Sequence, residues 1–371
     1  MIIGFPKEKG MKEGRVAVTP DGVSFLKGNN QTILVEKSAG EGVGFSDEDY
    51  KKAGAKIVDT PEELYSSSEM IVKVLPPLPS EVDLLKKEQI LFCFLHLGSD
   101  KNLTQALLNK KVTAIAYEQI RTEDNKYPVL LPMSEIAGKM SVQIAANLLS
   151  DKENGSGLLL GGIAGVPSAK VLIIGAGAVG INAAKVAAGM GADVKIADIS
   201  TKKLRSVANI LGSQIKTFVA TGSILENLVK ESNVVIGAVH ANKYSVVITE
   251  SMVKSMKKGS VIVDISIDEG GIVETEDRMT TLDNPTYIKH GVIHYCVPNI
   301  ASSVAKTATI ALTNETLDFI ESIAENGVVN AIKKDTSLFN GVMVYNGLLT
   351  SKAISSTHQL EYNELSSLIG F

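Results

Sequence analysis

A run of three spaced glycines is the feature that most constrains the fold of this chain. Gly175-Ala176-Gly177-Ala178-Val179-Gly180 has the spacing G-x-G-x-x-G. Because six-residue glycine spacings also arise by chance in a chain with 32 glycines, the neighbouring residues matter more than the spacing. An apolar run, 171–174, precedes the loop, and an alanine-rich segment, 178–189, follows it. This context predicts a strand, a tight turn and a helix whose N-terminal amides face a pyrophosphate.

An acidic residue ends the next predicted strand. Asp198 lies 18 residues beyond Gly180, close to the spacing of about 20 residues that dinucleotide-binding sites use. Its carboxylate would accept hydrogen bonds from the adenosine ribose and repel a 2′-phosphate, so we predict NAD as cofactor rather than NADP. Two alternatives stay open at this point. The cations that follow (Lys202, Lys203 and Arg205) could favour a 2′-phosphate instead of forming a solvated helix face, and a flavodoxin-like sheet would bind no dinucleotide.

Short apolar runs alternate with segments of helical pattern along the chain, which predicts an α/β fold. We expect strands at 2–5, 33–35, 70–74, 90–95 and 112–117, and then at 171–174, 194–197, 234–238 and 261–265. Helix starts are expected at Thr19-Pro20, Ser46-Asp47 and Thr60-Pro61, where a hydroxyl can cap the first turn. A long helix over 134–149 is expected to be capped by Ser134, and the tail from 307 is expected to be helical. The sequence therefore predicts two Rossmann-like doubly wound domains.

Composition excludes several classes of protein. Of 371 residues, 44% are hydrophobic and 21% are charged, which is typical of a globular protein. The formal net charge of −4 argues against a nucleic-acid partner. We see no signal peptide and no apolar run long enough to span a membrane, so a cytoplasmic location is the expectation. Cys93 and Cys296 are expected to be buried thiols, and no residue cluster has the spacing of a metal site.

Three residues outside the glycine loop are candidates for chemistry. His96 ends the apolar run 90–95, and an imidazole there can exchange a proton near neutral pH. Arg15 follows a glycine- and charge-rich stretch, and its guanidinium can bind a carboxylate through two parallel hydrogen bonds. Asp268 ends the run 261–267 and precedes Glu269-Gly270-Gly271. Each also has a plainer interpretation: a structural histidine, a surface arginine and a turn residue.

Several stretches together resemble the bacterial L-alanine dehydrogenases, in the superfamily that includes the NAD-binding subunit of proton-translocating transhydrogenase. The similarity extends over nearly the whole chain. The matching stretches are 3–8 with 15–20, 89–92 through His96-Leu97, 114–118, 132–138, the glycine loop, 235–239, 264–271, and 294–297 with Asn299.

The resemblance implies an NAD-binding domain, residues 131–306, inserted into a discontinuous catalytic domain formed by residues 1–130 and 307–371. It implies a homohexamer that converts L-alanine, NAD and water to pyruvate, ammonium and NADH, so the partner is a small amino acid or 2-oxo acid. By position, Arg15 would bind the substrate carboxylate, His96 would be the acid/base, and Asp268 would assist at the carbinolamine. The NAD contacts would come from the glycine loop (Gly175, Gly177, Ala178, Val179 and Gly180) and from Ser134, Asp198 and Asn299.

The sequence departs from the family pattern at two places. The family usually reads Lys-Val-Lys-Glu-Pro where this chain has Lys73-Val74-Leu75-Pro76-Pro77, so Leu75 replaces the lysine that holds the substrate carbonyl. Lys73 lies two residues back on the same face of an extended strand, and we predict that its flexible stem brings the ammonium to the substrate. The loop 240–244 is also shorter than in the family. Two other functions therefore remain open: a related dehydrogenase or reductase for another amino or imino acid, and a non-catalytic NAD-binding homologue.

Overall fold

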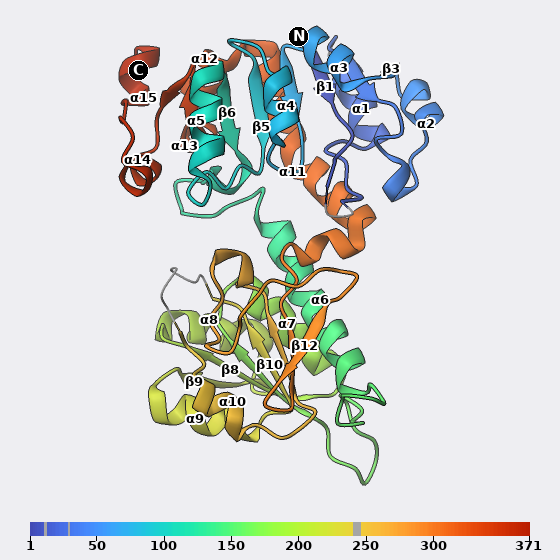
Figure 1. Ribbon diagram of the computed structural model, residues 1–371, viewed down its shortest axis with the longest axis vertical. Coiled ribbons are helices and arrows are strands. Elements are labelled where there is room, and N and C mark those ends of the chain that lie inside the picture. The colour runs from blue at the N-terminus through green and yellow to red at the C-terminus, as the bar shows by residue number, and fades with distance from the viewer. Residues whose placement is uncertain (11–12, 29, 240–245) are drawn as a thin grey trace. The chain divides into compact units, whose positions relative to one another are not determined.

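The computed structural model describes residues 1–10, 13–28, 30–239 and 246–371, so the loop 240–244 lies outside the described residues. The chain divides into two compact units (Figure 1). The terminal unit comprises Met1–Met133 and Val304–Phe371, and the inserted unit comprises Ser134–Ser303. The sequence-based boundaries, residues 130 and 307, lie close to these.

The terminal unit is built on a mixed sheet with the strand order β15-β14-β6-β5-β4-β1-β2-β3 among the described residues. Strands β1 to β6 pair in parallel, and β14 and β15 pair antiparallel at one edge. The strands are β1 (Ile2–Phe5), β2 (Thr32–Glu36), β3 (Lys56–Val58), β4 (Met70–Val72), β5 (Ile90–Cys93), β6 (Thr113–Ala116), β14 (Val342–Tyr345) and β15 (Leu348–Leu349). The central strands are buried on both faces, as expected of a parallel sheet covered by helices.

Three helices of the terminal unit begin at the hydroxyl caps that the sequence predicts, namely Thr19, Ser46 and Thr60. Ser46 accepts a hydrogen bond from the Asp49 amide, and Thr60 accepts one from the Glu63 amide. Such caps satisfy amides that have no partner within the helix. The helices are α1 (Pro20–Gly28), η1 (Glu41–Val43), α2 (Asp47–Lys52), α3 (Pro61–Ser67), α4 (Pro79–Leu84), α5 (Lys101–Lys110), η2 (Tyr117–Gln119), α11 (Ala305–Asn326), α12 (Val328–Lys334), α13 (Thr336–Gly341), α14 (Lys352–His358) and α15 (Leu365–Ile369).

The inserted unit has its own sheet, in the order β12-β13-β11-β10-β7-β8-β9 among the described residues. All neighbouring strands pair in parallel except β12, which pairs antiparallel with β13. The strands are β7 (Lys170–Ile174), β8 (Asp193–Asp198), β9 (Lys216–Val219), β10 (Val234–Gly237), β11 (Val261–Asp264), β12 (Thr286–Lys289) and β13 (Val292–Tyr295). Both sheets therefore contain the strand order 3-2-1-4-5-6 of the Rossmann fold.

Helices cover both faces of the inserted sheet. Alternate residues of β7 point to opposite sides: Val171 and Ile173 belong to one apolar cluster, and Leu172 and Ile174 belong to the other. The helices are α6 (Leu131–Leu149, which begins three residues before this unit), α7 (Ala178–Gly189), α8 (Thr201–Leu211), α9 (Gly222–Glu231), α10 (Glu250–Ser255), η3 (Ile267–Glu269) and η4 (Ile300–Val304). Within the described ranges, no helix is long and apolar enough to cross a membrane.

The structure corrects two predictions about elements. The tail is not wholly helical, because β14 and β15 form a hairpin that extends the terminal sheet. Helix α6 begins at Leu131 and not at Ser134, so Ser134 lies within its first turns and is not its N-cap. The prediction that both cysteines are buried thiols is confirmed.

Candidate active site

Candidate groups of the terminal unit lie beyond the carboxyl ends of its central parallel strands. The strand order of this sheet reverses between β1 and β4. Glu8 follows β1, Lys73 follows β4, His96 follows β5, and Glu118 follows β6. Open α/β sheets bind ligands beyond the carboxyl ends of their strands at such a reversal, so this edge is the candidate substrate site of the unit.

His96 is exposed and held in an unusual backbone conformation. Its φ angle of 47° lies in the left-handed region, which costs a residue other than glycine about 1–2 kcal/mol. The Glu118 carboxylate offsets this cost, because its Oε1 accepts a hydrogen bond of 2.7 Å from the His96 amide. The imidazole also stacks on Phe94, with ring centroids 6.0 Å apart. The imidazole is therefore both oriented and accessible, as a proton-transfer group requires.

Arg15 is buried, with 2% of its surface exposed, and forms a two-bond ion pair with Glu13. Its Nε donates to Glu13 Oε1 at 2.7 Å, and its Nη2 donates to Glu13 Oε2 at 2.6 Å. Its Nη1 lies 3.6 Å from the Met133 sulfur. This geometry excludes the interpretation of Arg15 as a surface arginine.

The ion pair with Glu13 leaves one edge of the Arg15 guanidinium available to bind a second carboxylate. A guanidinium carries five N–H groups, and the three contacts with Glu13 and Met133 use three of them. The other two N–H groups, one on each Nη atom, have no partner among the described residues, and they form a fork that matches a carboxylate. Glu13 thus fixes the plane of a group that can still bind a substrate acid end-on.

Lys73 lies in a buried charged cluster and is 1% exposed. Its Nζ is 2.9 Å from Glu81 and 3.4 Å from Glu8. Burial alone would lower the pKa of Lys73, but the two carboxylates raise it. Glu8 also accepts hydrogen bonds from the amides of Val74 and Leu75, at 2.6 and 3.4 Å. The cluster therefore fixes the backbone beside Leu75, and Lys73 could reach a substrate only by leaving both ion pairs.

The glycine loop of the inserted unit follows β7, where the strand order of the second sheet reverses. Gly175 has a φ of 113°, and a side chain there would collide with the Ala238 carbonyl. A side chain at Gly180 would collide with the Gly175 carbonyl, so these two glycines allow close packing. A methyl group at Gly177, in contrast, would meet no atom within 4 Å, which leaves open space at the start of α7. The three glycines therefore fit a pyrophosphate at this turn.

Asp198 ends β8 and points its carboxylate at the glycine loop. Oδ2 accepts a hydrogen bond of 2.8 Å from the Ala176 amide, and Oδ1 accepts one of 2.7 Å from the Ser200 amide. The Lys203 ammonium is 4.0 Å away and largely exposed, whereas the Asp198 side chain is 5% exposed. The buried charge beside the loop is thus negative, and the cations that follow belong to the exposed part of α8.

The other predicted cofactor residues lie on separate elements of the inserted unit. Ala178 and Val179 form the first turn of α7, Ser134 is half-buried in α6, and Asn299 is exposed just before η4 with a φ of 55°. Asp268 does not end a strand as predicted: β11 ends at Asp264, and Asp268 is exposed in the single turn η3. No described contact tests the roles assigned to these residues.

The sequence does not single out two carboxylates that position candidate side chains. Glu13 orients Arg15, and Glu118 holds the His96 backbone. Their sequence signals are weak, because neither a carboxylate two residues from an arginine nor one at a strand end is distinctive. Their importance becomes visible only when the strands are placed side by side.

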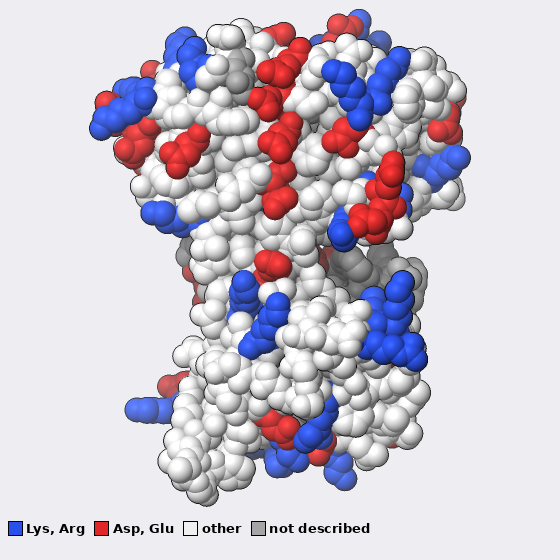
Figure 2. All heavy atoms as spheres, turned by 180° about the vertical axis from the view of Figure 1, so that it is seen from behind, with Lys and Arg blue, Asp and Glu red and all other residues white. Residues whose placement is uncertain are grey.

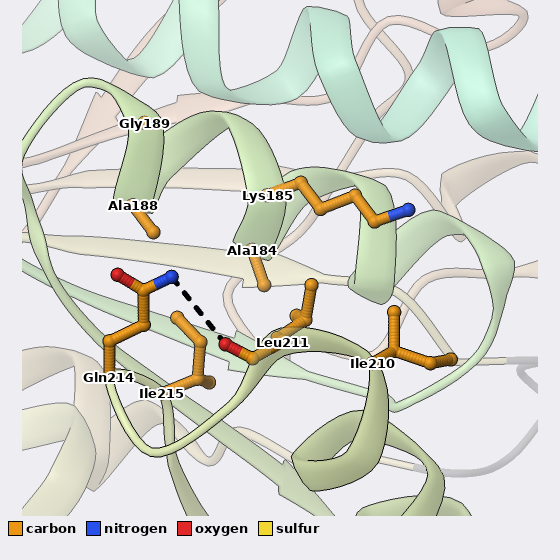
Figure 3. Close-up of a pocket in the computed structure, with 8 residues that line it drawn as sticks. All are labelled: Ala184, Lys185, Ala188, Gly189, Ile210, Leu211, Gln214 and Ile215. Carbon is orange, nitrogen blue, oxygen red and sulfur yellow. Dashed lines mark hydrogen bonds between the residues drawn. The ribbon is translucent and has the colours of Figure 1, made fainter.

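Other surface features do not coincide with the candidate residues. Figure 2 shows acidic and basic side chains on both units, in keeping with the small net charge. Figure 3 shows a pocket beside α7 and the end of α8, where Gln214 Nε2 donates to the Leu211 carbonyl at 3.5 Å. Its lining includes none of the predicted site residues.

The fold and the two strand-edge sites define an α/β protein with two Rossmann-type units. Models of the alanine dehydrogenase/PNT family match it in two parts, the N-terminal domain over residues 4–137 and the C-terminal domain over residues 141–352. The chain therefore belongs to the alanine dehydrogenase/PNT family.

Similar proteins match along their whole length. Alanine dehydrogenase of Methanococcus maripaludis is 47% identical over 364 residues, which cover 98% of each chain. Alanine dehydrogenase of Staphylococcus epidermidis is 46% identical over 367 residues, covering 98% of this chain and 99% of the relative. A solved structure of an L-alanine dehydrogenase superposes with a TM-score of 0.93 at 41% identity, covering 97% of this chain and 99% of that one.

Proposed function

We propose that this protein catalyses the reversible, NAD-dependent oxidative deamination of L-alanine to pyruvate and ammonium. The observation that carries the proposal is the full-length similarity to proteins named alanine dehydrogenase, at 46–47% identity. The geometry supports it, because the terminal unit offers an oriented arginine and an accessible histidine, and the inserted unit offers a glycine loop with an acid beside it.

The inserted unit supplies the proposed cofactor site. The glycine loop and the amides at the start of α7 would hold the pyrophosphate, Asp198 the adenosine ribose, and Ser134 and Asn299 further parts of the dinucleotide. NAD, when bound, would take up the hydrogen and two electrons that leave the alanine α-carbon. Because the Asp198 carboxylate is buried beside the loop, a 2′-phosphate would meet a negative charge, which supports NAD over NADP.

The terminal unit supplies the proposed substrate chemistry. The two remaining N–H groups of the Arg15 guanidinium bind the alanine carboxylate. The ion pair with Glu13 fixes the plane of the guanidinium, and therefore the orientation in which the carboxylate binds. His96 takes a proton from the water that adds to the imine, and returns it to the departing ammonia. By similarity to the family, Asp268 is proposed to assist at the carbinolamine that this addition forms.

Leu75 is the feature behind one alternative, a related enzyme for another amino or imino acid, which the similarity to alanine dehydrogenases does not favour. Since Lys73 is held by Glu8 and Glu81, the position that usually bears the substrate lysine offers only an apolar side chain. A screen of amino acids as substrates, with NADH formation followed by absorbance, distinguishes the proposed function from its alternatives. Turnover of L-alanine above the other amino acids supports the proposal, turnover of another amino acid supports the alternative, and NAD binding without turnover supports a non-catalytic homologue.

We also propose, by similarity to the family, that the protein is a cytoplasmic homohexamer. The mass of the assembly in solution tests this, because one chain has a mass of 39.4 kDa. A hexamer would be six times heavier, and a monomer or dimer under assay conditions would contradict the proposal.

A further inference from the structure

One buried side chain closes the loop that presents Asp268. Asp264, at the end of β11, is 1% exposed. Its Oδ1 accepts a hydrogen bond of 2.8 Å from the Ser266 amide, and its Oδ2 accepts one of 2.7 Å from the Ile272 amide. The same carboxylate therefore ties the beginning of the loop 264–272 to its end, and Asp268 lies between the two tied amides.

A second carboxyl group packs against this closure. The carboxyl group of Glu276 lies beside that of Asp264, where the two can form a hydrogen bond if one of them is protonated, and Glu276 Oε2 also accepts a bond of 3.3 Å from the Val273 amide. A side chain at Gly271, whose φ is 71°, would strike Glu276 Oε2 and come within 3.3 Å of Asp264 Oδ2. The loop thus passes between two carboxyl groups at a position where only glycine fits.

The neighbours of the two carboxyl groups are uncharged at neutral pH. Burial raises the pKa of Cys296, whose thiol donates to Glu276 Oε1 at 3.4 Å, and it also raises the pKa of Tyr287 beside that thiol. Burial lowers the pKa of His294. Charged side chains farther along the same segment pair with one another, namely Asp277 with Arg278 and Lys289.

Two ionised carboxylates in hydrogen-bond contact would repel each other, and no buried cation is among these neighbouring groups. One proton removes the conflict, because a protonated Glu276 can donate to Asp264 while Asp264 accepts from both loop amides. Burial first, and then the charge of Asp264, raise the pKa of Glu276 to about 9. Asp264 accepts its two bonds at 2.7 and 2.8 Å, whereas Glu276 accepts its two at 3.3 and 3.4 Å, so the geometry also favours Glu276 as the group that holds the proton.

We propose that Asp264 and Glu276 share one proton and act as a positioning pair that holds the Asp268 loop in place for catalysis. The inference about Asp268 rests on the proposed alanine dehydrogenase function. The pair itself does not, because its closure of the loop depends only on the contacts of Asp264 and Glu276.

The first test measures the shared proton without activity. Between pH 5 and pH 8 the folded protein would hold a proton that the unfolded chain lacks, so unfolding should release about one proton more from wild type than from Glu276→Gln. The matched control is Glu274→Gln, which changes an exposed carboxyl group two residues away. The measurement is the urea concentration at half-unfolding as a function of pH, at one protein concentration. If this midpoint changes with pH equally in wild type and Glu276→Gln, the inference of a shared proton is wrong.

The second test measures loop closure by hydrogen exchange at the Ser266 and Ile272 amides. In Asp264→Asn, one of the two acceptor oxygens becomes an NH₂ group, so exchange of at least one amide should accelerate about tenfold or more. In Glu276→Gln, the side-chain amide still donates to Asp264, and protection should be retained. Unchanged exchange in Asp264→Asn would refute the closure.

The third test asks whether the pair acts through Asp268. Asp264→Asn should lower kcat by about tenfold to a hundredfold, with the Kd for NAD nearly unchanged. In an Asp268→Ala background the same substitution should have little further effect, because two changes that act through one group are not additive. An equal loss in both backgrounds would show that the pair does not act through Asp268. If Asp268→Ala alone retains full turnover, the proposed role of Asp268 fails, and the first two tests still decide the pair.

Discussion

Replacing Arg15 by lysine tests the proposed substrate contact while keeping the charge. Glu13 is buried, with 2% of its side chain exposed, and lies directly beside the guanidinium. In Arg15→Lys the introduced ammonium should therefore pair with Glu13, which avoids the cost of about 3–5 kcal/mol of an unpaired buried charge. The variant should fold, but it should have no fork left for a substrate carboxylate.

The expected loss of kcat/KM in Arg15→Lys follows from the hydrogen bonds to the substrate that the variant lacks. The structure leaves two guanidinium N–H groups for the substrate acid. A hydrogen bond to a charged group contributes about 1.5–3 kcal/mol, so losing two costs about 3–6 kcal/mol. Since each 1.4 kcal/mol is a factor of ten, kcat/KM for L-alanine should fall by about 10²–10⁴.

Steady-state kinetics with L-alanine, followed as NADH absorbance, measure this ratio. Arg121→Lys is the matched control, because Arg121 is in the same unit and its Nη1 donates a hydrogen bond of 2.9 Å to Asn125 Oδ1. The Kd for NAD, measured by calorimetry, should be unchanged in both variants. An Arg15→Lys enzyme within about threefold of wild type would refute the proposed role of Arg15.

The remaining predictions concern the cofactor, the proton-transfer group and the unusual leucine. NAD should bind more tightly than NADP in calorimetric titrations. Asp198→Asn should reduce the difference between the two affinities, because a carboxylate about 4 Å from a phosphate costs up to about 4 kcal/mol per charge pair near a protein surface. Equal affinity of the wild type for NAD and NADP would contradict this prediction. His96→Ala should lower turnover by about 10²–10⁴ with little change in NAD affinity, and near-native turnover would make His96 structural. If Lys73 leaves its ion pairs to bind the substrate carbonyl, Lys73→Ala should abolish turnover of alanine. If Lys73 stays in its ion pairs, Leu75→Lys should raise turnover of alanine. Identical turnover in wild type, Lys73→Ala and Leu75→Lys would show that this position does not govern the chemistry.

The sequence predicts the parallel cores well because their signals are local. Helix α7 occupies the predicted residues 178–189, since a glycine turn marks where it begins. The terminal hairpin was missed although Asn346-Gly347 separates its strands, with φ angles of 49° and 84°. Asn-Gly between apolar runs is a strong hairpin signal, but it lies within a tail whose other segments have a helical pattern.

The candidate site is less predictable, because its geometry depends on distant residues. Lys73 and Leu75 share a face of an extended strand in the sequence-based picture, which makes Lys73 a natural substitute for the missing lysine. The structure places Glu8, 65 residues earlier, and Glu81 against its ammonium. Contacts of this kind arise from strand order, and no local pattern reveals them.

The most direct test of the proposed function follows the α-hydrogen of the substrate. L-alanine deuterated at the α-carbon is incubated with the purified protein and NAD, and the pyruvate and the reduced cofactor are quantified by mass spectrometry. We predict one pyruvate for each reduced cofactor, with the deuterium in the nicotinamide ring. Pyruvate without labelled cofactor, or no turnover of L-alanine while another amino acid reacts, would contradict the proposal.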